Sequence, residues 1–172
     1  MNFQFYFEKL SSSKEFRKFI KDYPDAYSCS CFFVIDLENK GGGGERQHFD
    51  YYVPSANKIF SFQLESECKV VPVETAEARK PAEISLNHCF NFSDVERIIQ
   101  DRMNNGGISS RMQRMLFSIQ NINGEDFLLG TIFISGLGLV RANIRISSME
   151  IVEFEKKSFF DIVRVGGKKG KF

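Results

Sequence analysis

A repeated helix-start signal constrains this chain more than any other feature of its sequence. Residues 12–15 and 93–96 both read S-x-x-E, and the two copies lie 81 residues apart. In this pattern the serine hydroxyl and the glutamate carboxylate bond free backbone N–H groups in the first turn of a helix. The repeat therefore predicts two helices that begin at corresponding points of two similar halves.

Apolar side chains follow both start signals at helical spacing. The two stripes consist of Phe16, Phe19, Ile20 and Tyr23, and of Val95, Ile98, Ile99 and Met103. We predict amphipathic helices over 13–22 and 94–104, each with one face in the core. A short segment precedes each helix, 3–7 in the first half and 84–86 in the second, and is predicted to be extended.

Alternating apolar residues and turn signals predict antiparallel strands after each helix. The predicted strands are 26–37, 49–53 and 60–64 in the first half, and 115–122, 127–135 and 140–146 in the second, with 149–155 as an extension. The predicted turns are 39–44, 54–57, 123–124 and 136–138. The fold class is therefore α+β, with two similar helix-plus-antiparallel-meander halves packed together. We expect modules at 1–74 and 84–165, a linker at 75–83 and a disordered basic tail at 166–172.

Four segments resemble the PepSY-like α+β module, in which a helix packs on a short meander. They are Tyr23 to Tyr27, Asp50 to Phe62, Ser118 to Gly124 and Leu139 to Ile146. The chain is similar to small archaeal proteins that carry two such modules in tandem. The four-glycine run at 41–44 and the absence of an export signal depart from the PepSY pattern. The resemblance implies no catalytic residue.

Charge and hydropathy limit the partners that we expect. With 23 Lys and Arg against 22 Asp and Glu, the formal charge is only +1, so no strong attraction to nucleic acid arises. The longest uncharged run, 127–140, is too short to span a membrane. The N-terminal sequence has no cationic start followed by an apolar run, so we predict a cytoplasmic protein.

Two sets of polar residues are candidate sites on predicted strands. His48, Asp50 and Tyr52 alternate along one strand, so an imidazole, a carboxylate and a phenol share a face suited to acid–base chemistry. The alternative is the solvated face of an amphipathic strand, and that is the reading we adopt. The second set, Arg141, Asn143 and Arg145, also shares one face and is a candidate for binding an anion or a partner.

Metal and cofactor signals are weak. Five potential zinc ligands, Cys29, Cys31, Cys68, His88 and Cys89, lack the C-x₂₋₄-C spacing of structural zinc sites, so we expect inert thiols and no metal. His88 and Cys89 are adjacent, so on a strand they point to opposite faces and cannot act as a base and nucleophile. The glycines at 41–44 and 136–138 lack the context of a phosphate-binding loop, and we predict no cofactor.

These observations favour a non-enzymatic binding or regulatory module. Aromatic-rich strands without a convergent catalytic set suit recognition of a protein or peptide through a sheet face or an edge strand, which also permits a homodimer. One alternative is a small-molecule carrier with a phenylalanine-lined pocket, suggested by 19 Phe and no Trp. Another is a small enzyme that uses His48 and Asp50.

Overall fold

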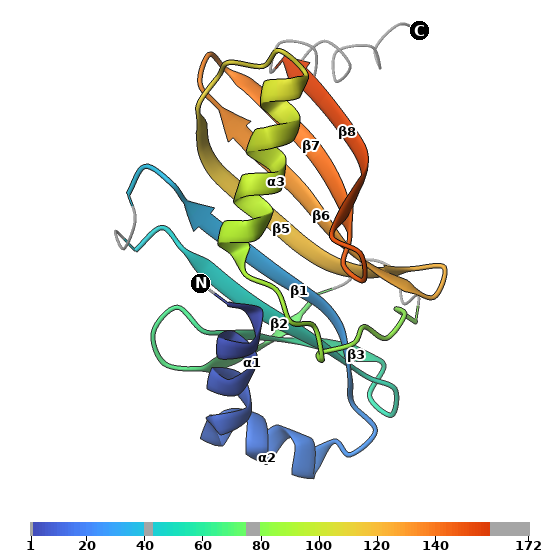
Figure 1. Ribbon diagram of the computed structural model, residues 1–172. Helices are drawn as coiled ribbons and strands as arrows, with labels where there is room; N and C mark the ends of the chain where they lie inside the picture. Colours follow the sequence, from blue (N-terminus) through green and yellow to red (C-terminus); the bar gives the residue numbers. More distant parts are fainter. Residues whose placement is uncertain (1, 40–42, 75–79, 159–172) are drawn as a thin grey trace, which may run out of the picture.

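The chain folds into one antiparallel sheet with helices on a single face (Figure 1). The computed structural model describes residues 2–39, 43–74 and 80–158. The elements of this part are α1 (Phe3–Ser12), α2 (Lys14–Asp22), β1 (Tyr27–Asp36), β2 (Arg46–Val53), β3 (Lys58–Gln63), β4 (Lys69–Val73), α3 (Phe92–Asn105), β5 (Met112–Ile122), β6 (Glu125–Ile134), β7 (Gly138–Arg145) and β8 (Glu150–Ser158). The predicted α+β class and the antiparallel sheet are confirmed.

The sheet is continuous across the predicted division between modules. Its strand order is β4-β3-β2-β1-β5-β6-β7-β8, so the first strands after the two helical segments pair with each other at the centre. In this central pairing Phe33 of β1 lies opposite Phe117 of β5. Buried residues from both sides of this seam form one core cluster. The division into two similar helix-plus-meander halves remains a prediction.

Phenylalanine side chains fill the space between the helices and the sheet. Figure 1 shows α1 and α2 over the β1–β3 part of the sheet and α3 over β5–β7. The fully buried phenylalanines of this layer are Phe3, Phe33, Phe49, Phe62, Phe92 and Phe117. The face of α3 that packs on the sheet consists of Phe92, Val95, Ile99 and Met103, which confirms most of the predicted stripe. In α2, Phe19 is buried but Ile20 is 36% exposed, so the buried stripe of this helix is narrower than predicted.

The prediction of an extended segment at 3–7 is wrong, because these residues begin α1. Asn2 caps the helix by accepting a hydrogen bond from the N–H of Gln4 at 2.9 Å. Phe3, Tyr6 and Leu10 then face the core, whereas Phe5 is 60% exposed. Alternating phenylalanines suggested a strand period, but the residues that are buried follow the helical spacing of three to four.

The predicted start signals are displaced from the observed helix starts. Ser13, not Ser12, caps α2, and its hydroxyl accepts from the N–H of Phe16 at 3.2 Å. The second helix begins at Phe92 after Asn91, whose side chain makes no capping hydrogen bond, so Ser93 lies inside the helix. Neither serine–glutamate pair forms the predicted reciprocal cap.

The strand predictions hold in the second half and are incomplete in the first. β5, β6 and β7 are confirmed, with Asn123 and Gly124 both at positive φ in the turn between β5 and β6. Residues 149–155, proposed as an extension, belong instead to a separate strand, β8, which pairs antiparallel with β7. β4 was not predicted, because its exposed sequence contains Pro72 and shows no apolar alternation. Residues 84–86, predicted to be extended, belong to no strand, and the predicted tail at 166–172 lies outside the described residues.

Candidate functional site

His48, Asp50 and Tyr52 all lie on the side of β2 that faces away from the helices. Their strand neighbours Phe49, Tyr51 and Val53 belong to the core, so the alternation predicted for this strand is confirmed. His48 nevertheless does not act with Asp50. Its Nε2 atom lies 2.6 Å from Oε1 of Glu65, which follows β3. This contact holds the imidazole at the strand's outer surface.

Asp50 is partly enclosed on the same face. Burial raises the pKa of its carboxyl group, an effect opposed by a hydrogen bond from the Ser61 hydroxyl and by the charge of His48. In the sheet Asp50 lies between Ser30 of β1 and Ser61 of β3. A carboxyl group in this setting is a weaker acid than usual, which is a property of general acids but also of any enclosed carboxylate.

Tyr52 is a structural residue. Its side chain is 8% exposed, and its hydroxyl donates a hydrogen bond to Oδ1 of Asn57 at 2.8 Å. Its ring packs edge-on against Tyr27, whose hydroxyl bonds the carbonyl of Pro81 at 2.8 Å. The expectation of a wholly solvated face is therefore wrong at this end of β2, because residues before α3 lie against it.

The second predicted set, Arg141, Asn143 and Arg145, lies on β7. Arg145 bridges two carboxylates, Glu125 at 3.1 Å and Glu150 at 2.8 Å. The amide of Asn143 donates to the carboxylate of Glu153. Arg141 is exposed and makes no hydrogen bond or ion pair with any residue that the structure describes. Of the three, only Arg141 has a charge free to meet a ligand.

The strand register brings both predicted sets to one face of the sheet, which we call the open face. His48 pairs with Phe32, Phe32 with Ser118, Ser118 with Leu129, and Leu129 with Asn143. Residues paired directly in an antiparallel sheet point to the same side. The row crosses four strand spacings, which places His48 and Asn143 about 19 Å apart. The two sets therefore flank a common surface and do not form one catalytic centre.

An apolar centre lies on the open face between and beside the two polar sets, next to an ion pair of Asp36 with Arg114 at 2.9 Å. Its side chains are Phe32, Val34, Leu116, Leu129, Phe133 and Leu139, and none belongs to the core cluster beneath the helices. Val34 and Leu139 are buried by their neighbours, while the other four are half-buried. Sequence reasoning missed this centre. Its signal was the unbroken apolar run 32–35, which predicts a strand covered by apolar contacts on both faces.

The cysteines and His88 do not gather into a metal site. A bulge between Ser28 and Ser30 breaks the alternation of β1, so Cys31 enters the core cluster and Cys29 does not. Burial raises the pKa of the Cys29 thiol to about 12 and that of Cys31 well above its ordinary value, so both thiols are poor nucleophiles. In the described part of the chain, no three His, Cys, Asp or Glu side chains are grouped to hold a metal.

His88 has a structural partner instead. Its Nε2 atom lies 2.9 Å from Oδ2 of Asp126, which also accepts from the N–H of Ser85 at 2.8 Å. The other carboxylate oxygen of Asp126 accepts from the amide of Asn121 at 2.7 Å. Asp126 thus fastens the segment before α3 to the β5–β6 hairpin.

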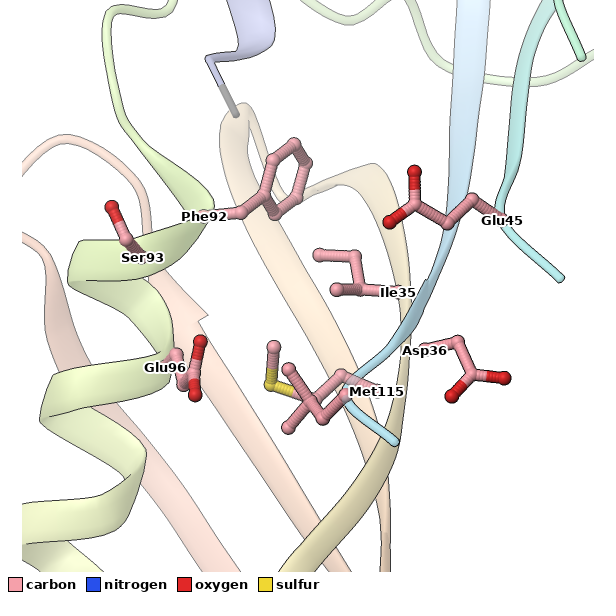
Figure 2. Close-up of a pocket in the computed structure, with 8 residues that line it drawn as sticks. Ile35, Asp36, Glu45, Phe92, Ser93, Glu96 and Met115 are labelled. Atoms are coloured by element: carbon pink, nitrogen blue, oxygen red, sulfur yellow. The ribbon is translucent and has the colours of Figure 1, made fainter. Parts of the chain in front are cut away.

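A small pocket opens on the helix side, at the amino end of α3 (Figure 2). Ile35 and Met115, which are paired across the central seam, lie between Phe92 and Glu96 of α3 and Glu45 before β2. The pocket has a volume of about 210 Å³, below the usual range of ligand sites, and Phe92 is its only phenylalanine. A wider groove of about 610 Å³ beside Ser28 and Tyr51 has no phenylalanine in its lining.

Comparison with known proteins identifies the fold alone. No protein-family model matches the sequence, and neither does any curated protein. Among solved structures, the chain is similar to a putative lipoprotein from Clostridium difficile 630, at 12% identity and a TM-score of 0.55. The match covers 83% of this chain and 90% of the other. The PepSY-like resemblance remains a prediction. Within the described residues, no helix is long and apolar enough to cross a membrane.

Proposed function

We propose that this chain is a non-enzymatic binding module that recognises a partner protein through the open face of its sheet. The observation that supports this proposal is the apolar centre of that face, bordered by the polar residues of β2 and β7. An apolar centre with a polar rim is the usual arrangement of protein interfaces. The helices cover the other face of the sheet, so the open face is the sheet face left for a partner.

The geometry supports recognition better than the two alternatives. An enzyme built on His48 and Asp50 needs both groups to converge on a substrate, but His48 is engaged by Glu65. A phenylalanine-lined carrier needs an enclosed cavity, whereas the six fully buried phenylalanines occupy the core and the hollow of about 300 Å³ beside Phe19 and Phe60 is open to solvent. The name of the structural neighbour supplies no function for this chain. The cytoplasmic location stays a prediction, which fractionation of the source cells tests.

Site-specific photocrosslinking tests the open face directly. We would replace Phe133, which is half-buried in the apolar centre, by benzoylphenylalanine and irradiate cells that express the full chain. The matched control places the same amino acid at Phe5, which is 60% exposed on α1. We expect an adduct of defined mass from position 133 and none from position 5.

A second substitution in the crosslinking chain separates recognition from random collision. Leu129→Lys places a charge in the apolar centre and is expected to abolish the adduct, while Leu137→Lys, in the turn after β6, is expected to preserve it. Circular dichroism would establish that both variants fold. Equal adducts from positions 133 and 5, or none from position 133, would refute the proposal.

A further inference from the structure

A hollow of about 230 Å³ opens on the open face, where Asp36 of β1, Arg114 of β5 and Phe133 of β6 pair side by side. Glu38, which follows β1, and Gln113, in the bulge of β5, complete its lining. We call it the corner hollow. Phe133 also belongs to the apolar centre, so the corner hollow adjoins the surface for which we propose a partner.

The volume of the corner hollow suits a single aromatic ring. It is smaller than the roughly 300–1,000 Å³ of most small-molecule sites. A cavity of about 150 Å³ nevertheless holds benzene, so there is room here for one ring that carries a small substituent. Pockets that receive one large side chain of a partner are where the binding energy of protein interfaces concentrates.

Asp36 is the buried charge of the corner hollow, and the chain itself already engages it. Its Oδ1 atom accepts from the N–H groups of Glu38 at 3.0 Å and Asn39 at 2.9 Å, and its Oδ2 atom accepts from Arg114 at 2.9 Å. The hydrogen bond from Asn39, followed by that from Arg114, lowers the pKa of the Asp36 carboxyl group. The carboxylate is therefore charged at neutral pH.

Arg114 and Glu38 each keep a hydrogen-bonding atom free. The guanidinium of Arg114 has several N–H donors, is half exposed, and bonds only Asp36 among the described residues. Oε1 of Glu38 accepts from Arg111 at 2.6 Å and from Gln113 at 3.2 Å, whereas its Oε2 atom accepts from no residue that the structure describes. The corner hollow thus offers a free donor and a free acceptor, which one hydroxyl group can satisfy together.

The charges around the corner hollow cancel. Asp36 pairs with Arg114 at 2.9 Å, and Glu38 pairs with Arg111 at 2.6 Å. A carboxylate or an ammonium group would therefore meet a like charge as well as an opposite one, whereas a neutral ring with a hydroxyl group would not. Tryptophan only donates a hydrogen bond and phenylalanine forms none through its side chain, so tyrosine is the side chain whose chemistry matches the corner hollow.

We propose that the corner hollow is the anchor site for a tyrosine side chain of the partner protein, an inference that rests on the proposed function of the open face. The tyrosine ring packs against the ring of Phe133. Its hydroxyl group accepts from the guanidinium of Arg114 and donates to Oε2 of Glu38. The rest of the partner covers the apolar centre beside it, which excludes water from these hydrogen bonds.

Small aromatic probes and the intact wild-type chain test this site by NMR titration. The probes are p-cresol, toluene, p-toluate and 4-methylbenzylammonium, which share a methyl-substituted ring and differ in the group opposite the methyl. Binding is measured from the backbone amide signals of Arg114 and Phe133. We expect p-cresol, which is the side chain of tyrosine, to bind about fivefold more tightly than each of the other probes.

A change of charge tests the balance around the corner hollow. Glu38→Gln removes one negative charge and keeps an amide oxygen as an acceptor. The affinity for p-toluate should therefore rise several-fold, while the affinity for p-cresol should stay within about twofold. The control, Glu155→Gln, makes the same charge change on the open face but outside the corner hollow, and it should leave both affinities unchanged.

A change of ring tests the contact with Phe133. Phe133→Leu keeps an apolar side chain but removes the aromatic one, and it should weaken p-cresol binding by roughly two- to tenfold. The control, Phe32→Leu, makes the same substitution in the apolar centre outside the corner hollow and should keep the wild-type affinity. Circular dichroism would verify that the variants fold, and the four probes test the wild-type chain without any variant.

The proposal is wrong if toluene or a charged probe binds as tightly as p-cresol, if Glu38→Gln does not favour p-toluate, or if Phe32→Leu and Phe133→Leu lose binding equally. Crosslinking from position 133 requires a partner on the open face but not an intact corner hollow, because the crosslinker itself replaces the Phe133 ring. An adduct without a preference for p-cresol would therefore overturn the anchor site alone, and a preference for p-cresol without an adduct would overturn the proposed function.

Discussion

Gly130 allows the β5–β7 part of the sheet to pack under α3, and the substitution Gly130→Ala tests this directly. The residue lies on the helix side of β6, between Phe117 of β5 and Ala142 of β7. An added Cβ would lie 2.8 Å from Cε1 of Phe117 and 3.0 Å from the Ala142 carbonyl oxygen. Phe117 is fully buried, with its ring 6.0 Å from that of Phe92, so it has little room to move.

We expect Gly130→Ala to lower the stability of the folded chain, whereas replacing an ordinary strand glycine by alanine raises it. Alanine loses less backbone entropy on folding than glycine does, and this effect alone would stabilise the chain by roughly 0.5–1 kcal/mol. Overpacking a rigid core costs about 1–3 kcal/mol, and we expect this cost to dominate. The difference between the two effects is a net loss of up to about 2.5 kcal/mol, and because about 1 kcal/mol corresponds to roughly 2–4 °C in a chain of this size, the Tm should fall by up to roughly 10 °C.

Denaturant unfolding and differential scanning calorimetry would measure this effect. Gly138→Ala is the matched control, because the added Cβ there meets the Ile134 side chain at 3.0 Å and backbone only at 3.8 Å. It should cost less than Gly130→Ala. In the background of Phe117→Leu, Gly130→Ala should lose much of its cost, because the obstructing ring is gone. A Gly130→Ala chain as stable as the wild type would refute the packing described for β5–β7.

Three further predictions follow from the described contacts. Ser13→Ala should destabilise the chain by about 1 kcal/mol through loss of the α2 cap, while Ser93→Ala should change stability by less than roughly 0.5 kcal/mol; equal effects in urea titrations would contradict the assigned helix starts. Asp50→Asn should stabilise the chain at pH 7. Burial raises the pKa of the Asp50 carboxyl group in the folded chain, so its ionised form opposes folding at pH 7. The stability gained by Asp50→Asn should vanish as the pH falls below the pKa that this carboxyl group has in the unfolded chain. A loss of stability at pH 7 would instead show that the carboxylate is needed in its charged form. Elemental analysis of the purified chain should find no stoichiometric zinc, and a chelator should leave the Tm unchanged; one equivalent of zinc would contradict this.

The sequence predicted those parts of the fold that depend on local chemistry. Asn123 and Gly124 adopt positive φ because a tight hairpin requires it, and the strands on either side alternate as expected. The apolar face of α3 follows from the spacing of Val95, Ile99 and Met103. The serine–glutamate pattern located two helices correctly but misplaced their first residues. Asn2 and Asn91 occupy cap positions that this pattern does not describe.

The open face required information that no local pattern contains. Alternation along a strand assigns His48 and Asp50 to one side of β2, and Arg141 and Asn143 to one side of β7, but each assignment is relative to its own strand. Whether the two sides coincide depends on the pairing of β1 with β5, which joins strands about 80 residues apart in sequence. Which side stays uncovered depends in turn on all three helices packing on the opposite face. The run Phe32 to Ile35 carries part of this information, since a strand that is apolar on both sides needs contacts on both sides. Phe33 and Ile35 make their apolar contacts in the core beneath the helices, whereas Phe32 and Val34 lie on the face for which we propose a partner.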